Sequence, residues 1–108
     1  MKVETTEQFV LDREHQFQWY LTETDLDPEP ALELAERFAR AVDDTLETIS
    51  RTPLIGRRRF PEWTVDQVRS FPVRRPFNRF LIFYSIRSET VKATRLLEGH
   101  RRSAEDRT

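Results

Sequence analysis

The residues best suited to chemistry lie near the C-terminus, in the segment EGHRR. Glu98, His100 and Arg101 are close neighbours there, just beyond a predicted strand. A carboxylate, an imidazole that titrates near neutral pH and guanidinium groups could together act on a phosphodiester, with Arg69 as a further cation. A polar, frayed chain end explains the same residues equally well, so the segment alone does not predict catalysis.

Other reactive groups are scarce in this sequence. The chain has no cysteine, which excludes disulfides and thiolate nucleophiles and suits a reducing compartment. The second histidine, His15, stands among polar helix positions, and neither histidine has another ligand at metal spacing. With only two glycines, a glycine-rich phosphate loop is excluded. We therefore expect neither a metal nor a cofactor.

The strongest compositional signal is the distribution of charge. Residues 1–50 hold 4 Lys and Arg against 13 Asp and Glu, whereas residues 51–108 hold 14 against 6. Most of the later basic residues are arginines, whose planar guanidinium groups bind carboxylates or phosphates through two bonds. The candidates for one basic binding surface, with one interleaved aromatic, are Arg57, Arg69, Arg74, Arg75, Arg79, Phe80, Arg95 and Arg101. The alternatives are that the arginines shield sheet edges and that Phe80 belongs to the core.

The N-terminal part predicts a strand followed by a helix. Lys2–Glu4 fits a short strand, and Thr5 with Gln8 has the spacing of a capping box that starts a helix. The helix should bury one stripe of residues recurring at intervals of three and four. This stripe comprises Phe9, Val10, Phe17, Tyr20 and Leu21.

A second helix should begin at the cap residue Asp27, because Pro28 is tolerated in the first turn of a helix. It should end before Pro53, and Gly56 should then permit a tight turn. Its buried stripe is the clearest pattern in the chain: Leu34, Phe38, Ala41, Val42, Thr45, Leu46 and Ile49. The short link predicts an antiparallel helix hairpin.

The second half changes to a period of two residues. Val65–Val73, Arg79–Ile86 and Thr90–Leu97 are predicted strands, joined by turns at 76–78 and 87–89. The three arginines Arg57–Arg59 are expected in a loop. The fold class is therefore α+β, with an N-terminal strand, an antiparallel two-helix hairpin and a three-stranded antiparallel meander that the first strand joins.

Two strands carry more detailed expectations. Phe80–Tyr84 is apolar at every position, as in a central strand covered on both faces. In the last strand, alternation places Val91, Ala93, Arg95 and Leu97 on one face.

The chain is expected to be a single domain, residues 1–108, with a flexible tail from about residue 102. Without an apolar run or a signal peptide we expect a cytoplasmic protein that does not enter a membrane.

Four segments resemble the RelE/ParE superfamily of toxins from bacterial toxin-antitoxin modules, and most closely its ParE or plasmid-stabilisation branch. They are FQWYL, ALELAERFARAVDDTLETISRTPLIGRR, VRSFPVRRPFNRFLIFY and VKATRLLEGHRR. The most specific parts are the helix exit with Thr52, Pro53, Gly56 and Arg57, and the block from Arg69 to Tyr84. The similarity extends over nearly the whole chain.

The resemblance implies a toxin held in a hetero-oligomer by a ParD-like antitoxin, whose flexible segment wraps the hairpin and the sheet. ParE-like toxins poison DNA gyrase without a catalytic residue of their own. RelE-like toxins cut mRNA on the ribosome, using basic residues and often a C-terminal tyrosine. The tyrosines here are Tyr20 and Tyr84, neither in the tail, which argues against the RelE chemistry.

Many relatives end in His-Gly-x-Arg-Asp, and this chain matches that pattern only at Gly99 and Arg101. The resemblance therefore implies a gyrase-directed toxin that is not an enzyme and contacts nucleic acid only indirectly or weakly. One alternative is an mRNA endoribonuclease using Arg69, His100 and Arg101. The other is a degenerate toxin retained as an antitoxin-binding module.

Overall fold

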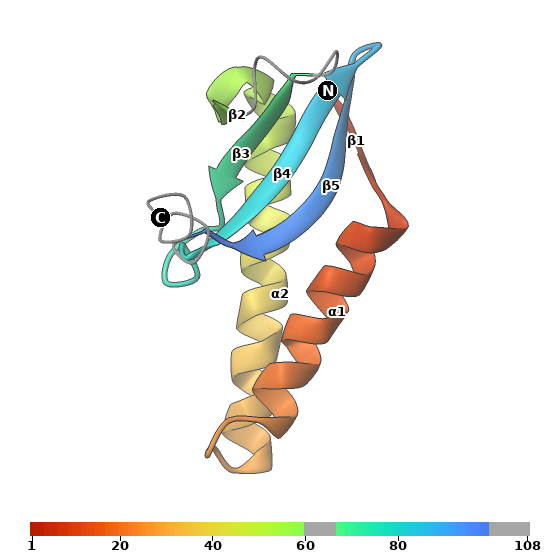
Figure 1. Ribbon diagram of the computed structural model, residues 1–108. Helices are drawn as coiled ribbons and strands as arrows, with labels where there is room; N and C mark the ends of the chain where they lie inside the picture. The colour runs from red at the N-terminus through yellow and green to blue at the C-terminus, as the bar shows by residue number, and fades with distance from the viewer. Residues whose placement is uncertain (60–66, 100–108) are drawn as a thin grey trace, which may run out of the picture.

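The computed structural model describes residues 1–59 and 67–99, which form a helix hairpin packed against one face of a β-sheet (Figure 1). In chain order the elements of this described part are β1 (Lys2–Thr5), α1 (Glu7–Thr22), α2 (Pro28–Arg51), the 3₁₀ helix η1 (Pro53–Ile55), β2 (Arg57–Arg59), β3 (Val68–Pro72), β4 (Phe80–Arg87) and β5 (Thr90–Glu98). The predicted α+β class and element order are confirmed. The expected tail and the first residues of the predicted strand Val65–Val73 lie outside the described residues.

The strands follow the order β1-β5-β4-β3-β2 across the sheet. β3, β4 and β5 form the predicted antiparallel meander, and β4 is central, as its apolar sequence indicates. The N-terminal strand joins the sheet beside β5 in a parallel orientation, with Val3 opposite Val91. A parallel neighbour requires a long crossover, and the helix hairpin begins this connection and covers one face of the sheet.

β2 corrects the expectation that Arg57–Arg59 lie in a loop. The three arginines form a short edge strand opposite Val68–Ser70 of β3. Strands are predicted from the alternation of apolar and polar residues. A run of three arginines has no such alternation, so the strand could not be predicted. Arginines on an edge strand also discourage pairing with a further chain.

Helix α2 supplies most of the helical side of the core. Its buried residues are Ala31, Ala35, Phe38, Ala41, Val42, Thr45 and Ile49, while Leu34 and Leu46 are half-buried at the margin. Phe38 lies at the centre, with ring centroids 5.4 Å from Tyr20, 5.5 Å from Phe77 and 5.4 Å from Phe80. Each such buried side chain contributes about 2 kcal/mol by leaving water. The predicted stripe is therefore the main core contact of the hairpin.

Helix α1 differs from the prediction at two positions. Thr6 rather than Thr5 is the N-cap, and its Oγ1 accepts a hydrogen bond of 3.1 Å from the amide of Phe9. Thr5 is still paired with Ala93 in the sheet, so the helix cannot begin there. Val10 was expected in the buried stripe but is 52% exposed. Phe9 takes the core-facing position, and the next residue is rotated about 100° away from it.

A bulge between β4 and β5 corrects the predicted faces of the last strand. Phe83 pairs with Arg95 and Tyr84 with Ala93, which leaves Thr94 as an extra residue. After this residue the alternation is reversed. Leu96 is therefore buried on the helix side together with Val91 and Ala93, whereas Arg95 and Leu97 were wrongly expected there.

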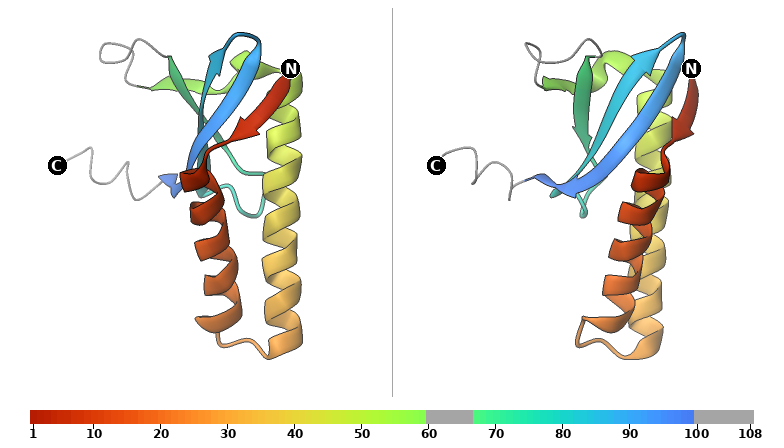
Figure 2. Two further views of the ribbon diagram at one scale, coloured as in Figure 1. Left: turned by 90° about the vertical axis from the view of Figure 1, so that its right-hand side faces the viewer. Right: turned by 45° about the vertical axis from the view of Figure 1, so that its right-hand side comes forward.

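The hairpin is longer than the sheet that it covers (Figure 2). Its far end, where α1 passes into α2, projects beyond the strands, so the two helices rest mainly on each other there. Nearer the sheet, Arg13 joins them through an ion pair of 2.8 Å with Asp43 and a hydrogen bond of 3.1 Å to the carbonyl of Ala39. Among the described residues, neither helix combines the length and the apolar character required to cross a bilayer.

The turn between β4 and β5 generates a stability prediction. Ser88 and Glu89 have φ angles of 50° and 61°, a left-handed conformation that favours Asn and Gly. We expect the double substitution Ser88→Asn with Glu89→Gly to raise the free energy of unfolding by about 1 kcal/mol, measured by urea denaturation. Asn78→Gly is the control, because among the described non-glycine residues only Ser88 and Glu89 have positive φ. An equal gain in the control would contradict this explanation.

Candidate functional site

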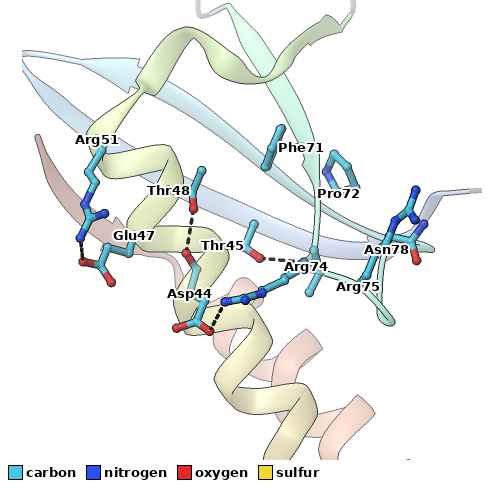
Figure 3. Close-up of a pocket in the computed structure, with 11 residues that line it drawn as sticks. Asp44, Thr45, Glu47, Thr48, Arg51, Phe71, Pro72, Arg74, Arg75 and Asn78 are labelled. Carbon is cyan, nitrogen blue, oxygen red and sulfur yellow. Dashed lines mark hydrogen bonds and ion pairs between the residues drawn. The ribbon is translucent and has the colours of Figure 1, made fainter.

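A groove runs between the C-terminal half of α2 and the end of β3 with the loop that follows it (Figure 3). Its volume is about 590 Å³. The helix contributes Asp44, Thr45, Glu47, Thr48 and Arg51, and the strand and loop contribute Phe71, Pro72, Val73, Arg74, Arg75 and Asn78. We call this cavity the α2 groove. It combines an apolar floor with a charged rim.

Thr45 explains why the loop lies beside the helix. Its hydroxyl donates a 2.7 Å hydrogen bond to the carbonyl of Ala41 and accepts a 2.9 Å bond from the amide of Arg74. The amide of Val73 meanwhile continues the strand pairing by donating to Phe80 at 2.9 Å. A buried hydroxyl with both bonds satisfied thus fixes one wall of the α2 groove against the other.

The rim of the α2 groove carries ion pairs that are weakly held. Arg74 and Asp44 are joined across the groove at 3.2 Å, and Glu47 pairs with Arg51 along the helix (Figure 3). The side chains of Arg74 and Asp44 are 71% and 53% exposed. Exposed pairs of this kind contribute about 0.2–1 kcal/mol, so an incoming charged group can replace one partner at little cost.

A second, smaller cavity of about 230 Å³ adjoins the first, on the side of the loop toward the middle of α2. We call it the arginine pocket. It is lined by Arg37, Arg40, Ala41, Asp44, Arg74, Arg75, Pro76 and Phe77. Sequence reasoning missed Arg37 and Arg40, because they belong to the acidic half of the chain. Their spacing of three residues, which places them on one helix face, was the available signal.

Arg69 has a structural role. Its Nη1 donates to the carbonyls of Gly56 at 2.8 Å and Leu54 at 3.3 Å, which holds the turn after α2. Tyr84 holds the same turn, because its hydroxyl donates to the carbonyl of Pro53 at 2.7 Å and accepts from the amide of Gly56 at 2.8 Å. We call these two hydrogen bonds the Tyr84 lock. Burial raises the pKa of Tyr84, and the Gly56 amide and the Arg69 charge only partly oppose this rise.

The Tyr84 lock also explains why position 56 is a glycine, and this explanation differs from the tight turn that the sequence predicted. Gly56 has an ordinary extended conformation, with φ −70°. A Cβ at this position would lie 2.4 Å from the Tyr84 hydroxyl oxygen. The close approach of a buried tyrosine, and not a turn, therefore excludes a side chain.

Arg95 is engaged with α1. Its Nε donates to Asp12 Oδ2 at 2.8 Å, and the same oxygen accepts from the amide of Leu96 at 2.9 Å. β1 pairs with β5 only as far as Ala93, and beyond that point the Asp12 carboxylate accepts the hydrogen bond from the edge of β5. Burial would raise the pKa of Asp12, but hydrogen bonds from Arg95, Leu96 and Gln8, together with the charge of Arg95, outweigh it and lower that pKa.

The arginines in the described part of the chain are therefore distributed over several places, and these residues do not form the single basic surface that was expected. Arg57 lies exposed on β2, opposite Ser70, and does not line the α2 groove. The guanidinium of Arg79 lies 5.3 Å from the ring centroid of Phe80. Phe80 is 4% exposed and belongs to the core, so it does not form a binding surface. Of the candidates that the structure describes, Arg74 and Arg75 alone line the groove.

The proposed catalytic set cannot be assembled from the described residues. His100 and Arg101 lie outside them, and Arg69 is occupied by backbone carbonyls. Within residues 1–59 and 67–99, no group of three His, Asp or Glu side chains is placed to hold a metal ion. The α2 groove and the arginine pocket instead offer guanidinium groups, carboxylates and hydroxyls around an apolar floor. This arrangement can recognise an amphipathic segment that carries acidic side chains.

Comparison with known proteins adds a likeness of fold. No protein-family model matches the sequence, and comparison with curated proteins gives no significant match. The structure matches one chain of a solved structure described as the chromosomal ParDE TA system from P. aeruginosa, with a TM-score of 0.65 and 16% sequence identity. The match covers 91% of this chain and 95% of that chain. The chain therefore has a ParE-like fold.

The Tyr84 lock predicts a non-additive pair of substitutions. Gly56→Ala should lower the free energy of unfolding by about 2 kcal/mol through overpacking. Tyr84→Phe should lower it by about 1–2 kcal/mol, because the Gly56 amide and the Pro53 carbonyl lose their partner. The double variant should lose at least 0.5 kcal/mol less than the sum, roughly the lower limit of coupling between contacting residues. Urea denaturation of the four proteins provides the measurement, and strictly additive losses would refute a direct contact.

The lowered pKa of Asp12 predicts a pH-dependent contribution to stability. The ionised carboxylate stabilises the fold above its unfolded pKa near 3.9, and this contribution is lost as pH falls through the lower folded value. Asp12→Asn should therefore reduce the free energy of unfolding by about 1 kcal/mol at pH 7, and the difference should shrink below about pH 4.

Glu47→Gln is the control for this prediction, since Glu47 forms an exposed pair with Arg51. It should change stability by less than about 0.5 kcal/mol at either pH. Denaturation at pH 7 and pH 3 measures both variants. A constant deficit in Asp12→Asn across this range would mean that charge has no part in the contact.

Proposed function

We propose that this protein is the toxin of a type II toxin-antitoxin module and that a ParD-like antitoxin neutralises it by binding in the α2 groove. The cellular action that we propose is the binding and poisoning of DNA gyrase. The observation that carries the proposal is the likeness of fold to a chain of a ParDE system over 91% of this chain. Fold likeness defines the class of hypothesis, and the site must supply the rest.

The α2 groove supports an antitoxin as the bound partner. It is open, it has Phe71 and Pro72 on its strand side, and its rim includes Arg51, Arg74 and Arg75. An amphipathic segment could place an apolar side chain between α2 and β3 and carboxylates on the rim. Apolar anchoring with a polar rim is the usual composition of protein interfaces.

The state of Arg69 favours binding over catalysis. A ribonuclease requires cations that are free to stabilise charge on a phosphate. Arg69 is the described member of the candidate catalytic set, and its guanidinium is bound to the carbonyls of Leu54 and Gly56. Moving it toward RNA would release the turn that follows α2. We therefore place the endoribonuclease reading second.

Purified components distinguish the possible cellular actions. We expect the protein to inhibit DNA supercoiling by gyrase and to trap cleaved DNA, and we expect an antitoxin to reverse both effects. The antitoxin is sought as the product of a neighbouring reading frame with a DNA-binding N-terminus and an acidic, amphipathic C-terminus. Defined cuts in ribosome-bound mRNA would instead establish an endoribonuclease. Antitoxin binding without either activity would indicate a degenerate toxin.

A blocking substitution tests the α2 groove itself. Thr48 is exposed on the wall of the groove, and its hydroxyl donates to the carbonyl one turn earlier, that of Asp44. Thr48→Trp should fill the groove and weaken antitoxin binding at least tenfold, measured by titration calorimetry. Thr22→Trp is a matched control, because Thr22 is also exposed on a helix and donates in the same way to Gln18. Equal affinities of the two variants would place the antitoxin elsewhere.

A further inference from the structure

The arginine pocket has an excess of positive charge at one end of the α2 groove. Arg37, Arg40, Arg74 and Arg75 line it, and Asp44 is the one acidic residue in its described lining. Asp44, Arg74 and Arg75 line both cavities, so the pocket adjoins the groove. Figure 3 shows Arg74 directed toward Asp44 while Arg75 extends toward Asn78. The Asp44–Arg74 pair therefore stands at the junction of the two cavities.

Most of this positive charge has no ion-pair partner among residues 1–59 and 67–99. Glu33 and Glu36 precede Arg37 and Arg40 by one helical turn, a spacing that permits ion pairs. Yet in the part of the chain that the structure describes, neither Arg37, Arg40 nor Arg75 lies within ion-pair distance of a carboxylate. Arg74 is the one member with a partner, and the exposure of that pair makes exchange easy.

We propose that the arginine pocket receives a carboxylate side chain of the docked partner and that this carboxylate displaces Asp44 from Arg74. In the free protein, Asp44 therefore occupies the position beside Arg74 that the partner's carboxylate takes in the complex. This inference rests on the proposed function in taking a peptide as the partner. It adds a direction to the docked segment: its acidic side chain lies at the middle of α2, and its apolar side chain lies toward Phe71.

The surroundings of the pocket favour a peptide over a nucleic acid. Arg74 already binds a carboxylate, that of Asp44, at 3.2 Å. Asp44 and Glu47 line the adjoining groove, where they would repel the closely spaced phosphates of a polynucleotide. The nearby Phe71 and Pro72 provide apolar contact that a phosphate backbone would not use. An acidic peptide with an apolar residue matches both halves of the site.

The free protein and a synthetic hexaglutamate peptide provide the test. The arginine Nε–Hε resonances are followed by ¹⁵N NMR during titration with the peptide at low salt. We expect saturable shifts at Arg37, Arg40 and Arg74, and little change at Arg57 on β2. Asp44→Asn should tighten binding about threefold, because the internal competitor is removed, and Arg74→Gln should weaken it by a similar factor.

Asp43→Asn is the matched control. It is the same chemical change one residue away, but Asp43 pairs with Arg13 on α1 and does not line the pocket. It should leave the affinity for hexaglutamate unchanged, and circular dichroism should show that both variants are folded. An equal gain in both variants would overturn the proposal, since general charge would then explain the effect. Shifts that are as large at Arg57 would also overturn it.

Hexathymidylate is the competing probe in the same titration. Tighter binding of this oligonucleotide than of hexaglutamate at Arg37, Arg40 and Arg74 would overturn the assignment to a peptide. The experiment uses neither gyrase nor an antitoxin. A protein that binds hexaglutamate as expected but inhibits no gyrase and binds no antitoxin would therefore disprove the proposed function and leave the carboxylate site standing.

Discussion

The contact between the apolar stripe of α2 and the helix-facing side of β4 determines the remaining arrangement. Phe38, Val42 and Ile49 are fully buried in this contact, together with Ile82 and Tyr84 from the strand. With the helix fixed in this position, its next face lies beside the end of β3. The α2 groove is therefore a consequence of core packing. One wall is the helix, and the other is the end of β3 with the loop that follows it, which the hydrogen bond from the Arg74 amide to Thr45 holds in place. A site whose walls are held in place needs little ordering when a partner binds.

The arginines illustrate how the same residue type serves two purposes. Arg69 is bound to backbone carbonyls and holds the turn after α2. Arg95 is bound to Asp12 and holds the edge of β5 against α1. Among the described residues, the side chain of Arg74 is held by one exposed ion pair, and the side chains of Arg37 and Arg40 have no ion pair. Guanidinium groups with many internal bonds cannot exchange partners cheaply, whereas those at the arginine pocket can. Composition alone could not separate these two groups.

The sequence predicted the fold well and the site only partly. The period of α2 and the apolar run of β4 specify which faces are buried, because burial repeats regularly along an element. Local irregularities escaped prediction: the bulge at Thr94 reverses the faces of β5, and the edge strand Arg57–Arg59 has no alternation. The site depends on tertiary neighbours, which bring α2 beside residues 71–78. Arg74 and Arg75 were found because they lie in the arginine-rich half of the chain. Arg37 and Arg40 were missed because they lie in the acidic half and join the site only through this juxtaposition.

The chemistry of the groove wall limits how the proposed partner could bind there. A segment that added a strand to β3 would need regular amide donors along the free edge beyond Ser70, the last residue paired with β2. The next residues include Pro72, which has no amide hydrogen, and the amides of Val73 and Arg74 already donate to Phe80 and Thr45. Binding of the proposed partner in the α2 groove would therefore rely on side chains: the apolar floor, the Asp44–Arg74 pair and the cations beyond it. Side-chain recognition of this kind is sensitive to salt at the charged end and to shape at the apolar end, so the two ends can be separated by experiment.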